Sequence, residues 1–118
     1  MFGRTRYTMS RPDPIHFDTL SWQDGLPGAR FKLYREGKRQ LRLVEFSSEF
    51  VEPDWCEKGH TGYVLEGTLE IDFKSHKITY PQGSDICIPP GPDTGHKAKP
   101  LTPVVKLILI EEVEHIQQ

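Results

Sequence analysis

The chain has 118 residues, of which 27% are charged, and its formal net charge is −2 at pH 7. This length suits one domain with a modest core, whereas two domains would each bury too little apolar surface. Because charges of both signs are interspersed, no basic face predicts binding to nucleic acid. The longest apolar run, 104–110, contains Lys106 and is far shorter than the roughly 20 residues of a membrane-spanning helix. We therefore expect no membrane partner.

Residues 1–30 are predicted to form an irregular N-terminal arm. Prolines and glycines interrupt this stretch, and its apolar residues follow neither the period of a strand nor that of a helix. Its apolar side chains, Trp22 among them, predict packing on the rest of the domain or on a partner subunit. The positive charge near Met1 is not followed by an apolar segment, so no secretory signal is predicted and the cytoplasm is the expected location.

Residues 31–118 are predicted to form one all-β domain. Short apolar runs separated by glycine- and proline-containing turns indicate strands at 31–34, 41–46, 61–66, 68–73, 77–80, 85–88 and 104–110. No segment has the pattern of a convincing amphipathic helix, and this rhythm is typical of a sandwich or barrel. The last run is apolar on both faces, which predicts burial between two layers or against a second copy. Together with the arm, it favours a homodimer.

The candidate site is a cluster of metal-ligating residue types around the segment 53–67. Asp54, Cys56 and His60 precede a predicted strand, and on an extended chain their even spacing directs them to one side. His96, which follows a rigid proline-rich loop, is the candidate for a fourth ligand. A thiolate together with imidazoles suits a divalent first-row ion, zinc above magnesium or calcium.

Each of these residues also has a plain structural interpretation. Cys56 would serve as a small buried hydrophobe, Asp54 as a turn residue beside Pro53, and His60 as a polar residue at the mouth of a barrel. Glu57 is a rival carboxylate that strand parity would point outward. Arg30 and Arg42 are candidates for recognising a substrate carboxylate, although nothing in the sequence ranks them above ordinary surface arginines.

The sequence resembles the cupin superfamily in two stretches. In the first, His60 is followed by six residues and Gly67, and the sequence of residues 63–67, Tyr-Val-Leu-Glu-Gly, is typical of the family's first motif. In the second, Gly83 is followed by five residues, two prolines and Gly91, with His96 at the place of that motif's histidine. The resemblance covers roughly residues 40–111 and implies a double-sheet jelly-roll barrel.

The resemblance places other residue types at the family's remaining ligand positions. Its first histidine falls on Asp54, its second on Cys56 and its glutamate on His60, whereas His96 keeps the family's residue type. What the resemblance implies is therefore a metal site with a changed set of ligands.

Two functions remain open from the sequence. The first is a metal-dependent enzyme that holds a small polar molecule in the barrel, such as an isomerase or a dioxygenase, as the resemblance to cupin enzymes implies. The second is a non-catalytic module that binds or senses a small ligand with a degenerate metal site. Weak candidates for an acid or base besides the metal ligands are Glu57, Tyr63 and Glu66.

Overall fold

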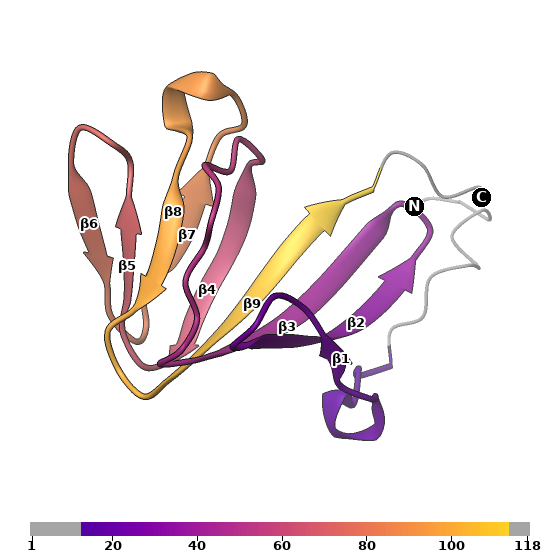
Figure 1. Ribbon diagram of the computed structural model, residues 1–118. Coiled ribbons are helices and arrows are strands. Elements are labelled where there is room, and N and C mark those ends of the chain that lie inside the picture. Colours follow the sequence, from indigo (N-terminus) through magenta and orange to yellow (C-terminus); the bar gives the residue numbers. More distant parts are fainter. Residues whose placement is uncertain (1–12, 114–118) are drawn as a thin grey trace.

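The structure is a computed structural model that describes residues 13–113. Within these residues the chain forms short 3-10 helices and nine antiparallel strands (Figure 1). They are η2 (Phe17–Thr19), β1 (Gln23–Asp24), β2 (Ala29–Glu36), β3 (Arg39–Ser47), β4 (His60–Glu66), β5 (Leu69–Asp72), β6 (Lys77–Tyr80), β7 (Asp85–Ile88), η3 (Pro92–Thr94), β8 (Lys97–Pro100) and β9 (Val104–Glu112). The prediction of an all-β fold is confirmed.

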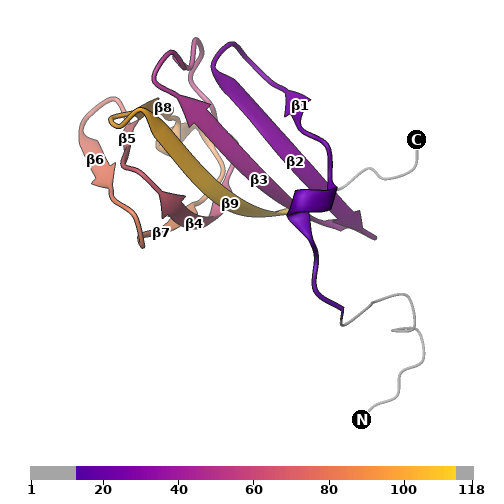
Figure 2. The same ribbon diagram turned by 90° about the horizontal axis from the view of Figure 1, so that it is seen from below.

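The strands form two sheets, as a jelly roll requires. The large sheet has the order β1-β2-β3-β9-β4-β7, and the small sheet has the order β6-β5-β8. Figure 2 shows β2, β3 and β9 side by side in the large sheet, with β5 and β6 of the small sheet across from them. In the second half of the chain, every connection except that from β5 to β6 crosses between the sheets, as from β4 to β5 and from β7 to β8.

The core lies between the inner faces of the two sheets. Strict alternation of apolar and polar residues along a strand places every second side chain inside. On β5, Leu69 and Ile71 are 1% and 3% exposed, and they face Val64 of β4 and Val105 of β9, each 0% exposed, within one cluster. Phe46 and Phe50 stack in the same cluster with ring centroids 4.2 Å apart.

Two strands were not apparent from the sequence. β1 and the first residues of β2 lie within 1–30, the range predicted to be irregular, and β8 lies in the lysine- and proline-containing stretch after His96. These short strands carry little apolar alternation and are defined by pairing with a neighbour, β1 with β2 and β8 with β5. Local pattern therefore could not reveal them.

The predicted last strand is longer than expected and is exposed on one face. β9 continues to Glu112, and it lies between β3 and β4 at the centre of the large sheet. Its inner residues Val105, Leu107 and Leu109 are buried, whereas Ile110 on the other face is 44% exposed. The apolar outer face is therefore uncovered in the monomer.

The turn at Gly67 connects the two sheets. Its φ of 80° is in the left-handed region, and a Cβ at this position would collide with the carbonyl oxygen of Val104. Glycine is required on both counts.

Residues 17–22 of the predicted arm lie against the outer face of β2. The Lys32 ammonium donates a hydrogen bond of 2.8 Å to the carbonyl of Phe17, and it lies 4.8 Å from the centre of the Trp22 ring. The arm thereby covers Lys32, which is only 9% exposed. Among the residues described, no helix has the length and apolar character needed to cross a membrane.

Candidate metal centre

Two loops come together beside the first residue of β4. The backbones of Cys56 and His96 form an isolated antiparallel bridge, with N–H to O distances of 2.8 and 2.9 Å. Next to Cys56, the carbonyl of Glu57 accepts a hydrogen bond of 2.9 Å from the Gly91 N–H. Directly opposed residues of an antiparallel pair point their side chains to the same face. The bridge therefore places the thiol and the imidazole next to each other.

The third member, His60, begins β4 and pairs with Ile88 of β7. Its Nε2 lies 3.9 Å from Sγ of Cys56, and its ring meets that of His96 edge to face with centroids 5.2 Å apart. One ligand atom from each of Cys56, His60 and His96 lies within 4.8 Å of the other two. The structure thus brings together three of the four residues that the sequence suggested.

Asp54 is the residue that the structure does not bring into this group. The chain bends at Asp54, and residues 53–59 form no continuous strand, so the predicted alternation of side chains does not hold there. The Asp54 side chain is exposed and lies outside the cluster of Cys56 and the two histidines. Glu57 is exposed as well.

The hydrogen bond of His96 and the lowered pKa of His60 both suit a metal ion. His96 is 3% exposed, and its Nδ1 donates to the carbonyl of Thr94 at 3.0 Å, since a carbonyl oxygen only accepts. This bond leaves the Nε2 lone pair of His96 for a ligand bond. Burial, reinforced by His96, Arg42 and Lys58 against the opposing effect of Glu111, lowers the pKa of His60 to about 4. A neutral imidazole is the form that binds a metal.

The group borders a cavity in the barrel interior. This cavity has a volume of about 420 Å³ and is lined mainly by core side chains such as Phe31, Ile71 and Leu109. The polar groups at its wall include Cys56, His60 and His96 together with Arg42, Lys58 and Glu52. An apolar cavity with a few convergent polar groups is the usual form of a small-molecule site.

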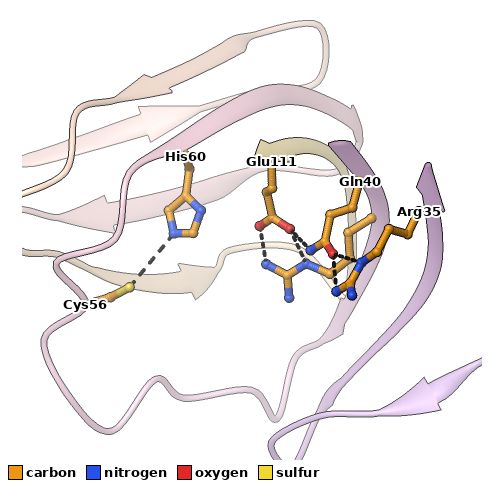
Figure 3. Close-up of polar contacts among 6 residues, drawn as sticks. Arg35, Gln40, Cys56, His60 and Glu111 are labelled. Atoms are coloured by element: carbon orange, nitrogen blue, oxygen red, sulfur yellow. Dashed lines mark hydrogen bonds and ion pairs between the residues drawn. The ribbon is translucent and has the colours of Figure 1, made fainter. Parts of the chain in front are cut away.

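A second polar group lies on the same inner face, where the start of β3 lies beside the end of β9. Glu111 accepts hydrogen bonds from Arg42 Nη2 at 2.7 Å and from Gln40 Nε2 at 2.5 Å, and Gln40 in turn accepts one from Arg35 at 2.9 Å (Figure 3). Burial alone would raise the pKa of Glu111, but these bonds from Arg42 and Gln40 lower it below the usual value. The carboxylate is therefore ionised at neutral pH.

Sequence reasoning missed Glu111 and left Arg42 unranked. Glu111 lies just beyond the predicted strand 104–110, but β9 continues through it to Glu112, and its carboxylate meets Arg42 on the inner face. It lies two and four residues after the inward-facing Leu109 and Leu107, and this even spacing was the signal that would have found it.

Three solved structures illustrate what the chain is similar to. KdgF from Halomonas sp. is 25% identical, with a TM-score of 0.69 over 83% of this chain and 92% of that one. A sugar phosphate isomerase from a cupin superfamily, from Silicibacter pomeroyi, is 13% identical, with a TM-score of 0.72 over 86% and 76%. A cupin-2 domain containing protein from Shewanella frigidimarina is 29% identical, with a TM-score of 0.57 over 70% and 78%.

No protein-family model matches the sequence, and no curated protein matches it significantly. The fold and these structural neighbours nevertheless match a small cupin-type domain. The resemblance noted in the sequence is thereby confirmed. In this chain, Cys56, His60 and His96 lie close enough together to bind a metal ion.

Proposed function

We propose that this protein binds one divalent metal ion through Cys56, His60 and His96 and holds a small polar molecule in the adjoining cavity. The observation that carries the proposal is the convergence of three ligand atoms within 4.8 Å of one another at the cavity wall. These atoms come from a loop, the start of β4 and the loop before β8. Convergence of a thiol and two imidazoles from separate segments has a simple physical explanation if they share an ion.

Zinc is the ion that we propose. A thiolate with two imidazoles matches its preference for sulfur and nitrogen ligands, whereas magnesium and calcium prefer oxygen. With Asp54 outside the group, Cys56, His60 and His96 would hold the ion as three protein ligands, which is the number found in catalytic zinc sites.

An ion bound here would supply a Lewis acid that polarises a carbonyl or activates water. This favours an isomerase or a related transformation of a small polar substrate, in keeping with the isomerase among the structural neighbours. A dioxygenase fits less well because a thiolate ligand is itself oxidised readily. Lys58 and Arg42 at the cavity wall would bind and orient polar groups of the substrate.

A non-catalytic module that binds or senses a small ligand is the second candidate. It is favoured by the scarcity of free acids and bases at the cavity wall. Glu52 accepts a hydrogen bond from the Ala98 N–H at 2.8 Å, and Glu111 is held by Arg42. Tyr63 and Glu66, considered above as acids or bases, are exposed and do not line the cavity.

The metal proposal is tested by metal analysis of protein purified without added metal, followed by calorimetric titration with zinc. We expect uptake approaching one equivalent per chain, and Cys56→Ser and His96→Gln should each weaken binding by more than about 100-fold. Cys87→Ser and His76→Gln are matched controls, because both residues are exposed and lie outside the cluster. Absence of zinc uptake by the unmodified protein would refute the proposal.

The two functional classes are separated by screening a metabolite library against the zinc-loaded protein. Turnover of a compound that disappears in Cys56→Ser supports the enzyme. A compound that raises the melting temperature of both the zinc-loaded protein and Cys56→Ser, and is recovered unchanged, supports the module.

We also propose a cytoplasmic homodimer that associates through the outer face of the large sheet. Tyr63, Leu65 and Ile110 lie on this face and are 45%, 42% and 44% exposed. Covering such a surface with a second copy would remove apolar area from water. Light scattering should give twice the chain mass, and Ile110→Lys should give the monomer mass. A monomeric unmodified protein would contradict this proposal.

A further inference from the structure

The two histidines of the centre differ in what holds them. His96 donates from Nδ1 to the Thr94 carbonyl at 3.0 Å, so its tautomer and ring orientation are set by the backbone. His60 directs Nε2 toward Cys56, but its Nδ1 is buried and has no hydrogen-bond partner among the described residues. A buried polar atom without a partner is costly, so a nearby acceptor for this N–H is expected.

Strand register places a carboxylate on the same inner face, opposite His60. β4 pairs with β9 through Thr61 with Ile110 and Gly62 with Leu109. Continued by one residue, this register places His60 opposite Glu111, and both side chains point to the inner face. Side chains directly opposed in an antiparallel pair have Cβ atoms about 4.5–5.5 Å apart. Figure 3 accordingly shows His60 with Cys56 on one side and Glu111 on the other.

Glu111 is itself held in one orientation. Arg42 donates to both of its oxygens, Nη2 to Oε2 at 2.7 Å and Nε to Oε1 at 3.2 Å, and Gln40 donates to Oε1 at 2.5 Å. Arg35 donates to Gln40 at 2.9 Å and so continues the chain to β2. Each carboxylate oxygen has more than one lone pair, so these bonds leave Glu111 able to accept a further hydrogen bond.

We propose that Glu111 is a positioning residue for the metal centre: one bridging water accepts the Nδ1–H of His60 and donates to the Glu111 carboxylate. The carboxylate holds the proton on Nδ1 and the lone pair of Nε2 toward Cys56. Glu111 thus does for His60 what the Thr94 carbonyl does for His96. Outer carboxylate partners of this kind orient metal-binding histidines and raise their basicity. The consequence for metal affinity rests on the proposed function, whereas the tautomer of His60 does not.

The test compares Glu111→Gln with Glu45→Gln. Glu45 is a matched control because it is ion-paired with Arg30 at 2.5 Å on the same sheet but lies outside the cavity. Long-range proton–nitrogen NMR of the metal-free protein at neutral pH reports which nitrogen of His60 carries the proton. We expect Nδ1–H in the unmodified protein and in Glu45→Gln, and a mixture of tautomers in Glu111→Gln. Zinc affinity should fall by about 10–100-fold in Glu111→Gln alone.

A second variant keeps the test valid if Glu111→Gln does not fold. Glu111→Asp retains the charge but withdraws the carboxylate by one methylene, so a partial loss of the Nδ1–H tautomer is expected. The inference is overturned if His60 carries its proton on Nε2 in the unmodified protein, or if neither variant of Glu111 changes the tautomer. If the protein takes up no zinc, the proposed function fails while the NMR result still decides the role of Glu111.

Discussion

The inner face of β9 changes in character along its length, and its two ends are instructive to compare. At its start, Val105 and Leu107 pack in the core with Val64 and Leu69, and we call these four residues the apolar end. At its finish, Glu111 joins Gln40, Arg42 and His60, which we call the polar end. Side chains alternate in the same way along the whole strand, but those on the inner face are apolar and buried at one end and include a charged residue at the other.

This difference separates what stabilises the fold from what performs its chemistry. The apolar end has side chains that are 0 to 4% exposed, and its contribution is the removal of apolar area from water. The polar end places charged groups beside a cavity, where each must be paired to offset its desolvation. We therefore expect substitutions at the apolar end to act on stability and those at the polar end to act on binding.

The largest effect on stability is expected for Leu69→Ala at the apolar end. Leu69 is 1% exposed, so truncation should lower the free energy of unfolding by about 2–5 kcal/mol. Leu65→Ala is the control, since Leu65 is 42% exposed on the outer face and should cost less than about 1 kcal/mol. Urea unfolding measures both. Equal losses in the two variants would show that the core is not where the structure places it.

An intermediate effect is expected for Arg42→Met at the polar end. This change removes the two hydrogen bonds to Glu111 and leaves a half-buried carboxylate with Gln40 alone, at a cost of about 1–3 kcal/mol. Arg39→Met is the control on the same strand, because Arg39 is exposed. Urea unfolding of the metal-free proteins measures the difference. A loss no larger than that of Arg39→Met would contradict the assigned network.

The pH dependence of stability should show a smaller contribution from Glu111. Its folded pKa is lowered below the unfolded value of 4.5, so its contribution is present above that value and is lost as pH falls through the folded pKa. Stability measured between about pH 5 and pH 3 should therefore fall more steeply in the unmodified protein than in Glu111→Gln. Parallel curves for the two proteins would indicate that the carboxylate has an ordinary pKa.

The smallest effect is expected for Trp55→Ala beside the metal centre. The ammonium groups of Lys74 and Lys97 lie 5.1 and 4.7 Å from the centre of this ring, which is 40% exposed. Exposed contacts of this kind contribute about 0.5–1 kcal/mol, so unfolding and zinc affinity should change little. A loss above about 2 kcal/mol would assign Trp55 a structural role that its exposure does not suggest.

The sequence predicted the apolar end far better than the polar end. Leu69 and Ile71 alternate with polar residues, and local alternation is enough to place such a strand in a sheet with its buried face. Cys56, His60 and His96 were suggested as ligands by residue type and by resemblance. Their convergence, however, depends on a backbone bridge between residues 56 and 96, which no local pattern encodes.

The hydrogen-bonded row of Arg35, Gln40 and Glu111 could not be predicted from the sequence, because it also depends on strand pairing. Glu111, Gln40 and Arg35 meet because three strands pair in one register, Gln40 opposite Glu111 and Arg35 opposite Gln40. Taken singly, each of these residues is of a type that is common at the exposed end of a strand. Asp54 shows the opposite outcome. Its spacing in the sequence suggested a ligand, but the chain bends at Asp54 and the exposed side chain lies outside the cluster.

The measurement that most directly tests the central claim is the absorption spectrum of the protein titrated with cobalt(II) in place of zinc. Binding through Cys56 predicts a thiolate-to-cobalt charge-transfer band that saturates at one equivalent, persists in Cys87→Ser and is lost in Cys56→Ser. A spectrum without that band, or one that Cys56→Ser leaves unchanged, would contradict a metal centre built on Cys56, His60 and His96.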